Sequence, residues 1–201
     1  KLGQTVLANS HVMKPADLGL VASLGIGEVT VYQLLKVAFF STGDELVSVG
    51  QPLEVGQIYD SNRYTLYGML SRLNMQISDL GNIPDDPKLL EKTLLDAAEN
   101  NDVVITSGGV SVGEADYMKA LLAKHGQVLF WKINMKPGRP LAYGKIGQNY
   151  NKQAHYFGLP GNPVSAMVTF YQFVQPALQA ISGEAYRPVP FFNVKCTESI
   201  K

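Results

Sequence analysis

Short apolar runs recur along this chain with the length and spacing of buried β-strands. Residues 36–40, 102–106 and 156–159 each form a nearly continuous apolar segment, followed by small or polar residues. Such runs are typical of strands that are buried on both faces of a parallel sheet. Residues 75–80 and 129–135 predict two further strands. The pattern therefore predicts a central sheet that is covered on both sides.

Between these runs, apolar residues return at helical spacing. Leu66, Leu70 and Leu73 mark one face of a helix over 63–73, and capping side chains precede it. Further helices are expected over 85–98, 117–124 and 162–181. Strands that alternate with helices in this way predict the α/β class, as a three-layer sandwich with a mostly parallel sheet and helices on both faces.

The two ends of the chain do not continue this alternation. Residues 15–25 predict a short helix and 29–32 a strand, whereas 187–194 predict a proline-bounded strand. We therefore expect three parts. Residues 1–34 are a remnant of a preceding domain and its linker, 35–183 are the α/β domain, and 184–201 begin a truncated C-terminal β domain.

Composition narrows the classes of function. The 201 residues have a formal net charge of zero, which gives no electrostatic reason to expect nucleic acid or a membrane as a partner. The longest apolar stretch, 167–181, is too short and too interrupted to span a bilayer. Cys196 is the only cysteine, so no intrachain disulfide can form and a reducing, cytoplasmic location is expected. The three histidines lack the spacing of a zinc site.

The segment 103–118 carries the clearest chemical signal, because a buried strand runs there into a glycine-rich turn. Its glycines can adopt positive φ and approach a ligand closely, and its serines add hydroxyl groups. The helix that follows offers unpaired N–H groups, so a phosphate or another oxyanion would fit. The residues concerned are Ser107, Gly108, Gly109, Ser111 and Gly113.

Two carboxylates, Glu114 and Asp116, follow this turn directly. Acids beside a bare phosphate would repel it, which argues that the anion arrives with a metal ion. A plain β-α turn with N-capping acids is the alternative, and these residues alone leave both readings open.

Other polar turns are expected at the same edge of the sheet, because ligands of parallel α/β sheets bind beyond the carboxyl ends of the strands. Residues 41–46 supply hydroxyls and two acids, and 159–163 form a Pro-Gly-Asn turn. Helix starts at 60–62 and 85–86 each carry a pair of capping residues. Most such residues only cap a helix, so we expect at most one residue of each pair to have a functional role.

A cationic segment completes the set of candidates. Lys132, Asn134 and Lys136 share one face if the chain there is extended, and Arg139 follows. Two lysines and an arginine suit a polyanion, whereas a solvated edge strand with cationic side chains is the alternative. The turn-forming residues at 137–140 favour the binding site, because a plain edge strand does not require them.

Five segments resemble, in order and spacing, the central domain of the molybdopterin molybdenumtransferase (MoeA) family, which is related to the E domains of gephyrin and plant Cnx1. They are residues 41–46, 59–62, 107–117, 136–140 and 159–165. The resemblance implies a molybdopterin-binding, MogA-like fold and a transferase of molybdenum cofactor biosynthesis. That enzyme would insert molybdate into adenylylated molybdopterin and release AMP. A Mg²⁺ requirement and a homodimer are also implied.

The matching positions imply individual roles. Glu45, Asp85, Asp116, Lys132 and Lys136 are expected to be catalytic, and Asp116 and Glu45 are also expected to hold Mg²⁺ at the pyrophosphate. Arg139 stands where the family commonly has lysine, which keeps the charge but changes the contact geometry. The expected substrate-binding residues are Thr42, Gly43, Asp44, Ser107, Gly108, Gly109, Ser111, Gly113, Arg139, Pro160, Gly161 and Asn162.

Two other functions stay open at this point. Molybdopterin adenylyltransferases share this domain type, and such an enzyme is also a candidate partner. A non-catalytic, gephyrin-like scaffold is the second alternative. The family's N-terminal regions and most of its C-terminal β domain have no counterpart in this sequence. The resemblance therefore does not imply that this chain is active by itself.

Overall fold

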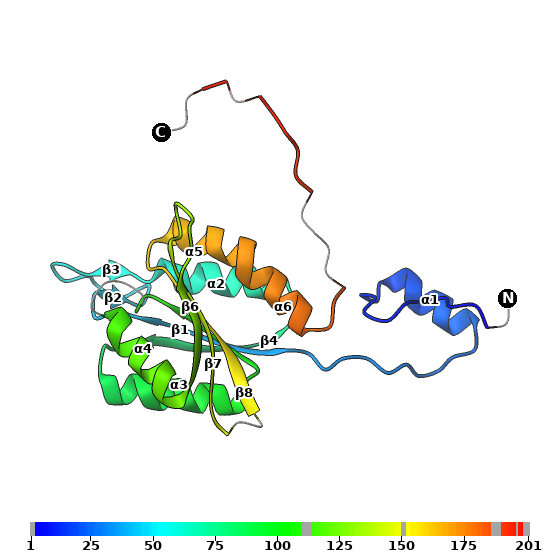
Figure 1. Ribbon diagram of the computed structural model, residues 1–201, viewed down its shortest axis with the longest axis horizontal. Coiled ribbons are helices and arrows are strands. Elements are labelled where there is room, and N and C mark those ends of the chain that lie inside the picture. Colours follow the sequence, from blue (N-terminus) through cyan, green and yellow to red (C-terminus); the bar gives the residue numbers. More distant parts are fainter. Residues whose placement is uncertain (1–2, 110–113, 150–151, 186–189, 196, 199–201) are drawn as a thin grey trace.

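A six-stranded sheet forms the centre of the molecule in the computed structural model (Figure 1). The structure describes residues 3–109, 114–149, 152–185, 190–195 and 197–198, without the side chains of 114–116 and 148–149. Across the sheet the strands are β4 (Gln76–Ile83), β1 (Lys36–Thr42), β5 (Val103–Ser107), β8 (Lys152–Leu159), β7 (Pro140–Asn149) and β6 (Gly126–Lys132). Strands β4, β1, β5 and β8 are parallel, and β7 is antiparallel to both of its neighbours. Strand β6 therefore ends at the same edge as the parallel strands.

Helices cover both faces of this sheet, as the sequence predicts (Figure 1). One face carries α2 (Ser61–Ser71), α5 (Pro163–Thr169), the π-helical segment η1 (Phe170–Val174) and α6 (Gln175–Ile181). The other carries α3 (Pro87–Asn100) and α4 (Glu114–His125). Side chains of β1 point alternately into two hydrophobic cores, one on each face of the sheet. Val37 and Phe39 face the first set of helices, and Ala38 and Phe40 face the second.

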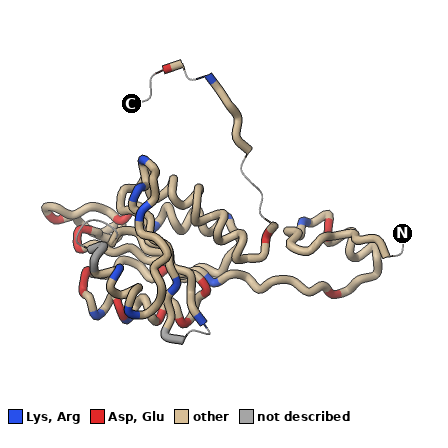
Figure 2. Tube along the Cα trace, viewed as in Figure 1, with Lys and Arg blue, Asp and Glu red and all other residues tan. Residues whose placement is uncertain are grey.

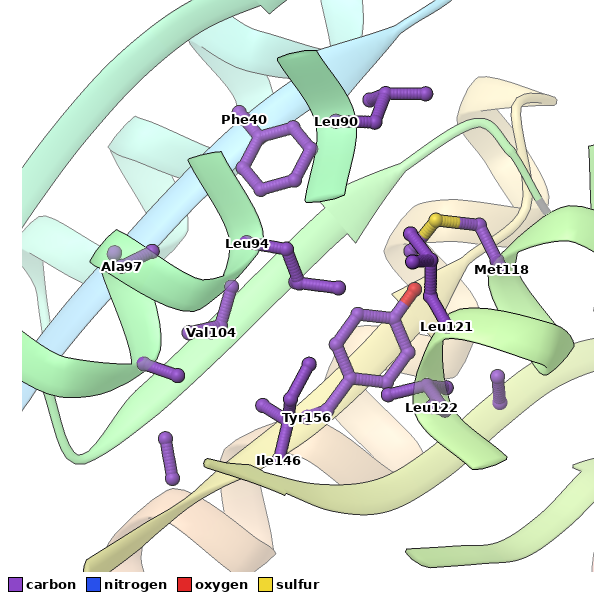
Figure 3. Packing of buried hydrophobic residues seen from close by; sticks show 14 of the residues in the cluster. Phe40, Leu90, Leu94, Ala97, Val104, Met118, Leu121, Leu122, Ile146 and Tyr156 are labelled. Carbon is purple, nitrogen blue, oxygen red and sulfur yellow. The ribbon is translucent and has the colours of Figure 1, made fainter. Parts of the chain in front are cut away.

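The core beneath α3 and α4 is built around Tyr156 of β8. Figure 3 shows its ring between Leu94 of α3 and Leu122 of α4. The Tyr156 hydroxyl lies 2.8 Å from Thr106 Oγ1 on β5, so the one polar atom of this fully buried side chain has a partner. Burial raises the pKa of Tyr156 far above its ordinary value.

The N-terminal segment projects from the α/β domain (Figure 1). Helix α1 (Pro15–Ser23) forms where it is predicted, but none of its residues is buried. The strand predicted over 29–32 is wrong, because this exposed segment pairs with no strand in the part of the chain that the structure describes. The prediction over 187–194 lies partly outside the described residues, and 190–194 are not in a strand.

Two other predictions need correction. The helix predicted over 162–181 contains η1, which ends two residues before Pro176. Proline lacks the N–H that an α-helix requires at this point, and a π-helical turn accommodates that loss. The strand predicted over 129–135 ends at Lys132, which pairs with Pro140 of β7. Residues 133–139 therefore form a hairpin loop, and the predicted common strand face of Lys132, Asn134 and Lys136 is wrong.

A small ribbon follows β1 that the apolar pattern does not reveal. Strands β2 (Leu46–Val47) and β3 (Ile58–Tyr59) pair in parallel and are too short to show a period. Among the described residues, no helix has the length and apolar character to cross a membrane.

Candidate functional site

The candidate residues gather where β4, β1, β5, β8 and β6 end. Thr42, the last residue of β1, donates a hydrogen bond from Oγ1 to Asp85 Oδ1 at 2.5 Å. The backbone N–H of Asp85 in turn donates to Asp44 Oδ1 at 3.1 Å. The structure thus joins the loops that follow β1 and β4. Asp86, rather than Asp85, caps α3 through the N–H of Leu89, so Asp85 is not a helix cap.

Glu45 lies over the end of β1. A Cβ atom placed on Gly43 would come within 2.6 Å of Glu45 Oε2, which shows that the carboxylate folds back across this glycine. Glu45 and Asp44 are both exposed. The loop after β1 therefore presents two carboxylates, with Asp85 half-buried beside them.

The glycine-rich turn after β5 packs directly on the end of β1. Gly108 has φ +89, and a Cβ atom there would meet the carbonyl oxygen of Thr42 at 2.3 Å. The N–H of Gly108 donates to the carbonyl of Leu159 at the end of β8. Gly109 also has positive φ and lies against the methyl group of Thr42. The close approach of three strand ends explains the requirement for glycine here.

Part of the predicted anion-binding turn lies outside the described residues. Ser111 and Gly113 belong to this part, and Asp116 lies in the first turn of α4 without a described side chain. Helix α4 itself is anchored to α3, because the Tyr117 hydroxyl donates to the carbonyl of Pro87. Burial, and secondarily the negative charge of Glu91, raise the pKa of Tyr117.

The far end of α4 is held by a second contact with α3. Glu91 Oε1 accepts from Lys124 Nζ at 2.7 Å and lies 2.5 Å from His125 Nε2. These two partners, Lys124 first, lower the pKa of Glu91. Helix α4 is thereby fixed at both ends, which fixes the direction in which its first turn approaches the sheet edge.

The start of α2 contributes two buried polar side chains that sequence reasoning treats as helix caps. Asp60 Oδ1 accepts from the N–H of Arg63, as a cap does, and also from Ser41 Oγ at 3.0 Å. Asn62 Nδ2 donates to Ser107 Oγ and to the carbonyl of Gly161, both at 2.8 Å. These contacts join residues 41, 107 and 161, which are far apart in the sequence.

The turn after β8 forms as predicted. Pro160 is buried, whereas Gly161 and Asn162 are exposed. Asn162 caps α5 by accepting from the N–H of Ser165 at 3.1 Å. The exposed part of the turn thus lies beside the start of a helix and next to the glycine-rich turn of β5.

The cationic loop lies at the other side of this turn. Gly138 packs on α5, since a Cβ atom there would meet Thr169 Cγ2 at 2.7 Å. Lys132, Lys136 and Arg139 are all exposed on or next to this loop. In Figure 2 the loop between β6 and β7 carries blue segments, and red segments gather around β2 and β3. The edge of the sheet thus has an acidic side and a basic side, with the two glycine-containing turns between them.

The donor atoms on the acidic side suit Mg²⁺. No three His, Cys, Asp or Glu side chains within the described part of the chain come together as a metal site. Mg²⁺ does not require such a cage, because it is commonly held by one or two carboxylates together with substrate phosphates and water. The exposed carboxylate of Glu45 fits that requirement, and the hard oxygen atoms of Asp85 and Thr42 lie in the adjoining loops.

Known proteins resemble this chain along nearly its whole length. A molybdopterin molybdenumtransferase from Haemophilus influenzae is 50% identical over 202 residues, which cover 100% of this chain and 49% of that protein. Gephyrin from Dictyostelium discoideum is 40% identical, over 90% of this chain and 28% of its own length. A solved structure of the molybdopterin biosynthesis MoeA protein from Pyrococcus horikoshii superposes with a TM-score of 0.72 at 28% identity, covering 91% of this chain and 43% of that one.

The chain therefore spans half or less of the length of each of these relatives. Its sequence also matches the family described as a probable molybdopterin binding domain, over residues 38–180. That match includes the strand ends, the glycine-rich turn and the cationic loop described above, and it confirms the resemblance seen in the sequence. This chain belongs to the family of probable molybdopterin-binding domains.

Proposed function

We propose that this chain provides the substrate-binding α/β domain of a molybdopterin molybdenumtransferase, which inserts molybdate into adenylylated molybdopterin and releases AMP. The observation that supports the proposal is the order of groups along the sheet edge: carboxylates after β1 and β4, a glycine-rich turn after β5, and cations after β6. A substrate with a phosphoanhydride can use all three kinds of group. The name of the Haemophilus influenzae relative points to the same activity.

The proposed role of each residue follows from its position along the sheet edge. Lys132 and Lys136, with Arg139, stabilise negative charge on the phosphates as the phosphoanhydride breaks. In the turn after β5, the N–H of Gly108 is already bonded to the carbonyl of Leu159, so the backbone N–H of Gly109 and the hydroxyl of Ser107 would be the donors to a bound oxyanion. Asp85 is oriented by the hydroxyl of Thr42, so it can hold a water molecule or the molybdate in a fixed direction.

Mg²⁺ is part of this proposal as the metal ion that Glu45 and Asp116 would hold. When bound, it would neutralise charge on the phosphates. Glu45 is suited to this role because it is exposed and folds over Gly43 at the end of β1. We further propose a cytoplasmic homodimer, with a molybdopterin adenylyltransferase as the enzyme that supplies the adenylylated substrate.

Two measurements test the proposed function. The chain should bind adenylylated molybdopterin in a titration, and with Mg²⁺ and molybdate it should release AMP, either alone or joined to the parts of a relative that it does not cover. Glu45→Gln should abolish AMP release with little change in binding, because it removes a charge but almost no volume.

The alternatives give different results in the same assays. An adenylyltransferase would instead consume ATP and molybdopterin and form the adenylylated compound. A scaffold domain would neither bind the substrate nor release AMP. Either outcome would contradict the proposal.

A further inference from the structure

Buried polar atoms without a partner gather near the functional edge. Four side-chain atoms within the described part of the chain are buried and lack a hydrogen bond. Two of them, Asp60 Oδ2 at the N-cap and Asn62 Oδ1 in the first turn, lie at the start of α2, and a third is Asn82 Oδ1 near the end of β4. Each such group costs about 1–3 kcal/mol, so its presence requires an explanation.

Helix capping does not explain these two side chains. The N-cap of α3 shows what capping alone requires: Asp86 is exposed, and its side chain accepts from the N–H of Leu89. Asp60 makes the equivalent bond to Arg63, yet it is only 2% exposed and also accepts from Ser41. Burying a carboxylate is unfavourable for a cap, since a cap works as well at the surface.

Asn62 is even less consistent with a capping role, because it occupies a position after the cap where no polar side chain is needed. It is 8% exposed, and its amide donates both to Ser107 Oγ and to the carbonyl of Gly161. These acceptors belong to the ends of β5 and β8, which are neighbouring strands. A single amide therefore fixes the distance between the glycine-rich turn and the turn that precedes α5.

We propose that Asp60 and Asn62 are positioning residues of the substrate site. Asp60 holds the end of β1 through Ser41, and Asn62 holds the ends of β5 and β8 together. The first turn of α2 thus sets three substrate loops relative to one another without touching the substrate. The proposal deepens the proposed function and rests on it for the identity of the substrate.

The test compares Asn62→Ala with Asn101→Ala. Asn101 is a matched control, since it is 7% exposed and its buried amide donates to the carbonyl of Ala97. It caps the end of α3 two residues before β5 begins, at the opposite edge of the sheet. Both variants should be less stable than the wild type, because each removes a buried, hydrogen-bonded amide. Only Asn62→Ala should weaken binding of adenylylated molybdopterin, by about tenfold or more.

Hydrogen exchange of the chain without substrate gives a second readout. The N–H of Gly108 bonds the carbonyl of Leu159, across the junction that Asn62 fixes. Exchange of this N–H should accelerate in Asn62→Ala more than global unfolding accounts for, and it should follow global stability alone in Asn101→Ala. Asp60→Asn, which retains an acceptor for Ser41, should keep more of the wild-type affinity than Asp60→Ala.

The two proposals fail in distinguishable ways. If the wild-type chain does not bind adenylylated molybdopterin, the proposed function fails, and the exchange of Gly108 still decides whether Asn62 holds the turns together. If the wild type binds but Asn62→Ala binds equally well, with unchanged local exchange, Asn62 is purely structural and the positioning role is refuted. If Asn62→Ala does not fold, the positioning role is tested by the affinities of Asp60→Asn and Asp60→Ala for adenylylated molybdopterin. Equal affinities of these two variants would refute it.

Discussion

Gly108→Ala probes the closest approach between two loops of the site. Gly108 has φ +89, a conformation that side-chain-bearing residues adopt at a cost of about 1–2 kcal/mol. Its new Cβ atom would also lie 2.3 Å from the carbonyl oxygen of Thr42. Because that oxygen belongs to the backbone of β1, the contact cannot be relieved by turning a side chain. The ends of β1 and β5 must move apart.

Gly50→Ala separates these two contributions. Gly50 has φ +93, almost the same as Gly108, but no atom lies within 4 Å of its added Cβ. The control therefore carries the conformational cost without the collision, and both variants lose the same unfolded-state flexibility. Overpacking typically costs about 1–3 kcal/mol, so Gly108→Ala should be less stable than Gly50→Ala by that amount.

Thermal and denaturant unfolding measure this difference directly. For a protein of this size, about 1–3 kcal/mol corresponds to a Tm roughly 2–12 °C below that of Gly50→Ala. Binding of adenylylated molybdopterin should weaken in Gly108→Ala and stay unchanged in Gly50→Ala. Equal stability of the two variants would refute the close packing of β1 on the glycine-rich turn. If the two variants are equally stable but only Gly108→Ala loses binding, Gly108 still belongs to the substrate site, while its close packing on β1 is refuted.

Three further variants test other parts of the molecule. Lys136→Ala should weaken binding of adenylylated molybdopterin about tenfold by removing a charge-assisted contact, with little loss of stability because the side chain is exposed. Destabilisation with normal binding in a titration would place the site elsewhere. Tyr156→Phe should reduce the free energy of unfolding by about 1–2 kcal/mol in urea, because its hydroxyl has a buried hydrogen-bond partner; unchanged stability would contradict that bond. Glu91→Gln should be less stable than the wild type at neutral pH. Because the pKa of Glu91 is lowered in the folded state, this difference should be fully present above the ordinary value of 4.5 and disappear as the pH falls through the lower folded value. A difference that persists in acid, measured by unfolding at several pH values, would contradict the ion pair with Lys124.

The sequence predicts the layers of the fold well because burial acts on each strand and helix locally. A strand with helices on both faces needs apolar residues throughout, and β5 is buried at all five positions. The same rule fails at the N-terminus. Val31 and Tyr32 favour a strand, yet they are 67% and 61% exposed and pair with no strand among the described residues. An intrinsic preference does not form a strand without its neighbour.

The candidate site shows a different limit. Turns such as the one at Gly108 are visible in the sequence, since glycine is required where the backbone has positive φ. The contacts of Asn62 are not visible, because its partners lie 45 and 99 residues away. Asp85 and Asp86 are adjacent acids at one helix start, and only three-dimensional structure shows which one caps α3 and which one bonds Thr42.

The order of strands also restricts the kind of ligand that can use the whole edge. Four strand spacings separate β1 from β6, and at about 4.8 Å each they place the two ends roughly 19 Å apart in a flat sheet. A lone oxyanion cannot contact Glu45 and Lys132 together over such a span. An elongated substrate can do so, with its phosphoanhydride over the turns between these ends, where a metal ion held by Glu45 would approach it from one side and the long lysine side chains from the other. The glycine-rich turn lies between these ends because β5 and β8 lie between β1 and β6. The separation of acidic and basic residues therefore favours a large adenylylated ligand over molybdate alone as the molecule that spans the site.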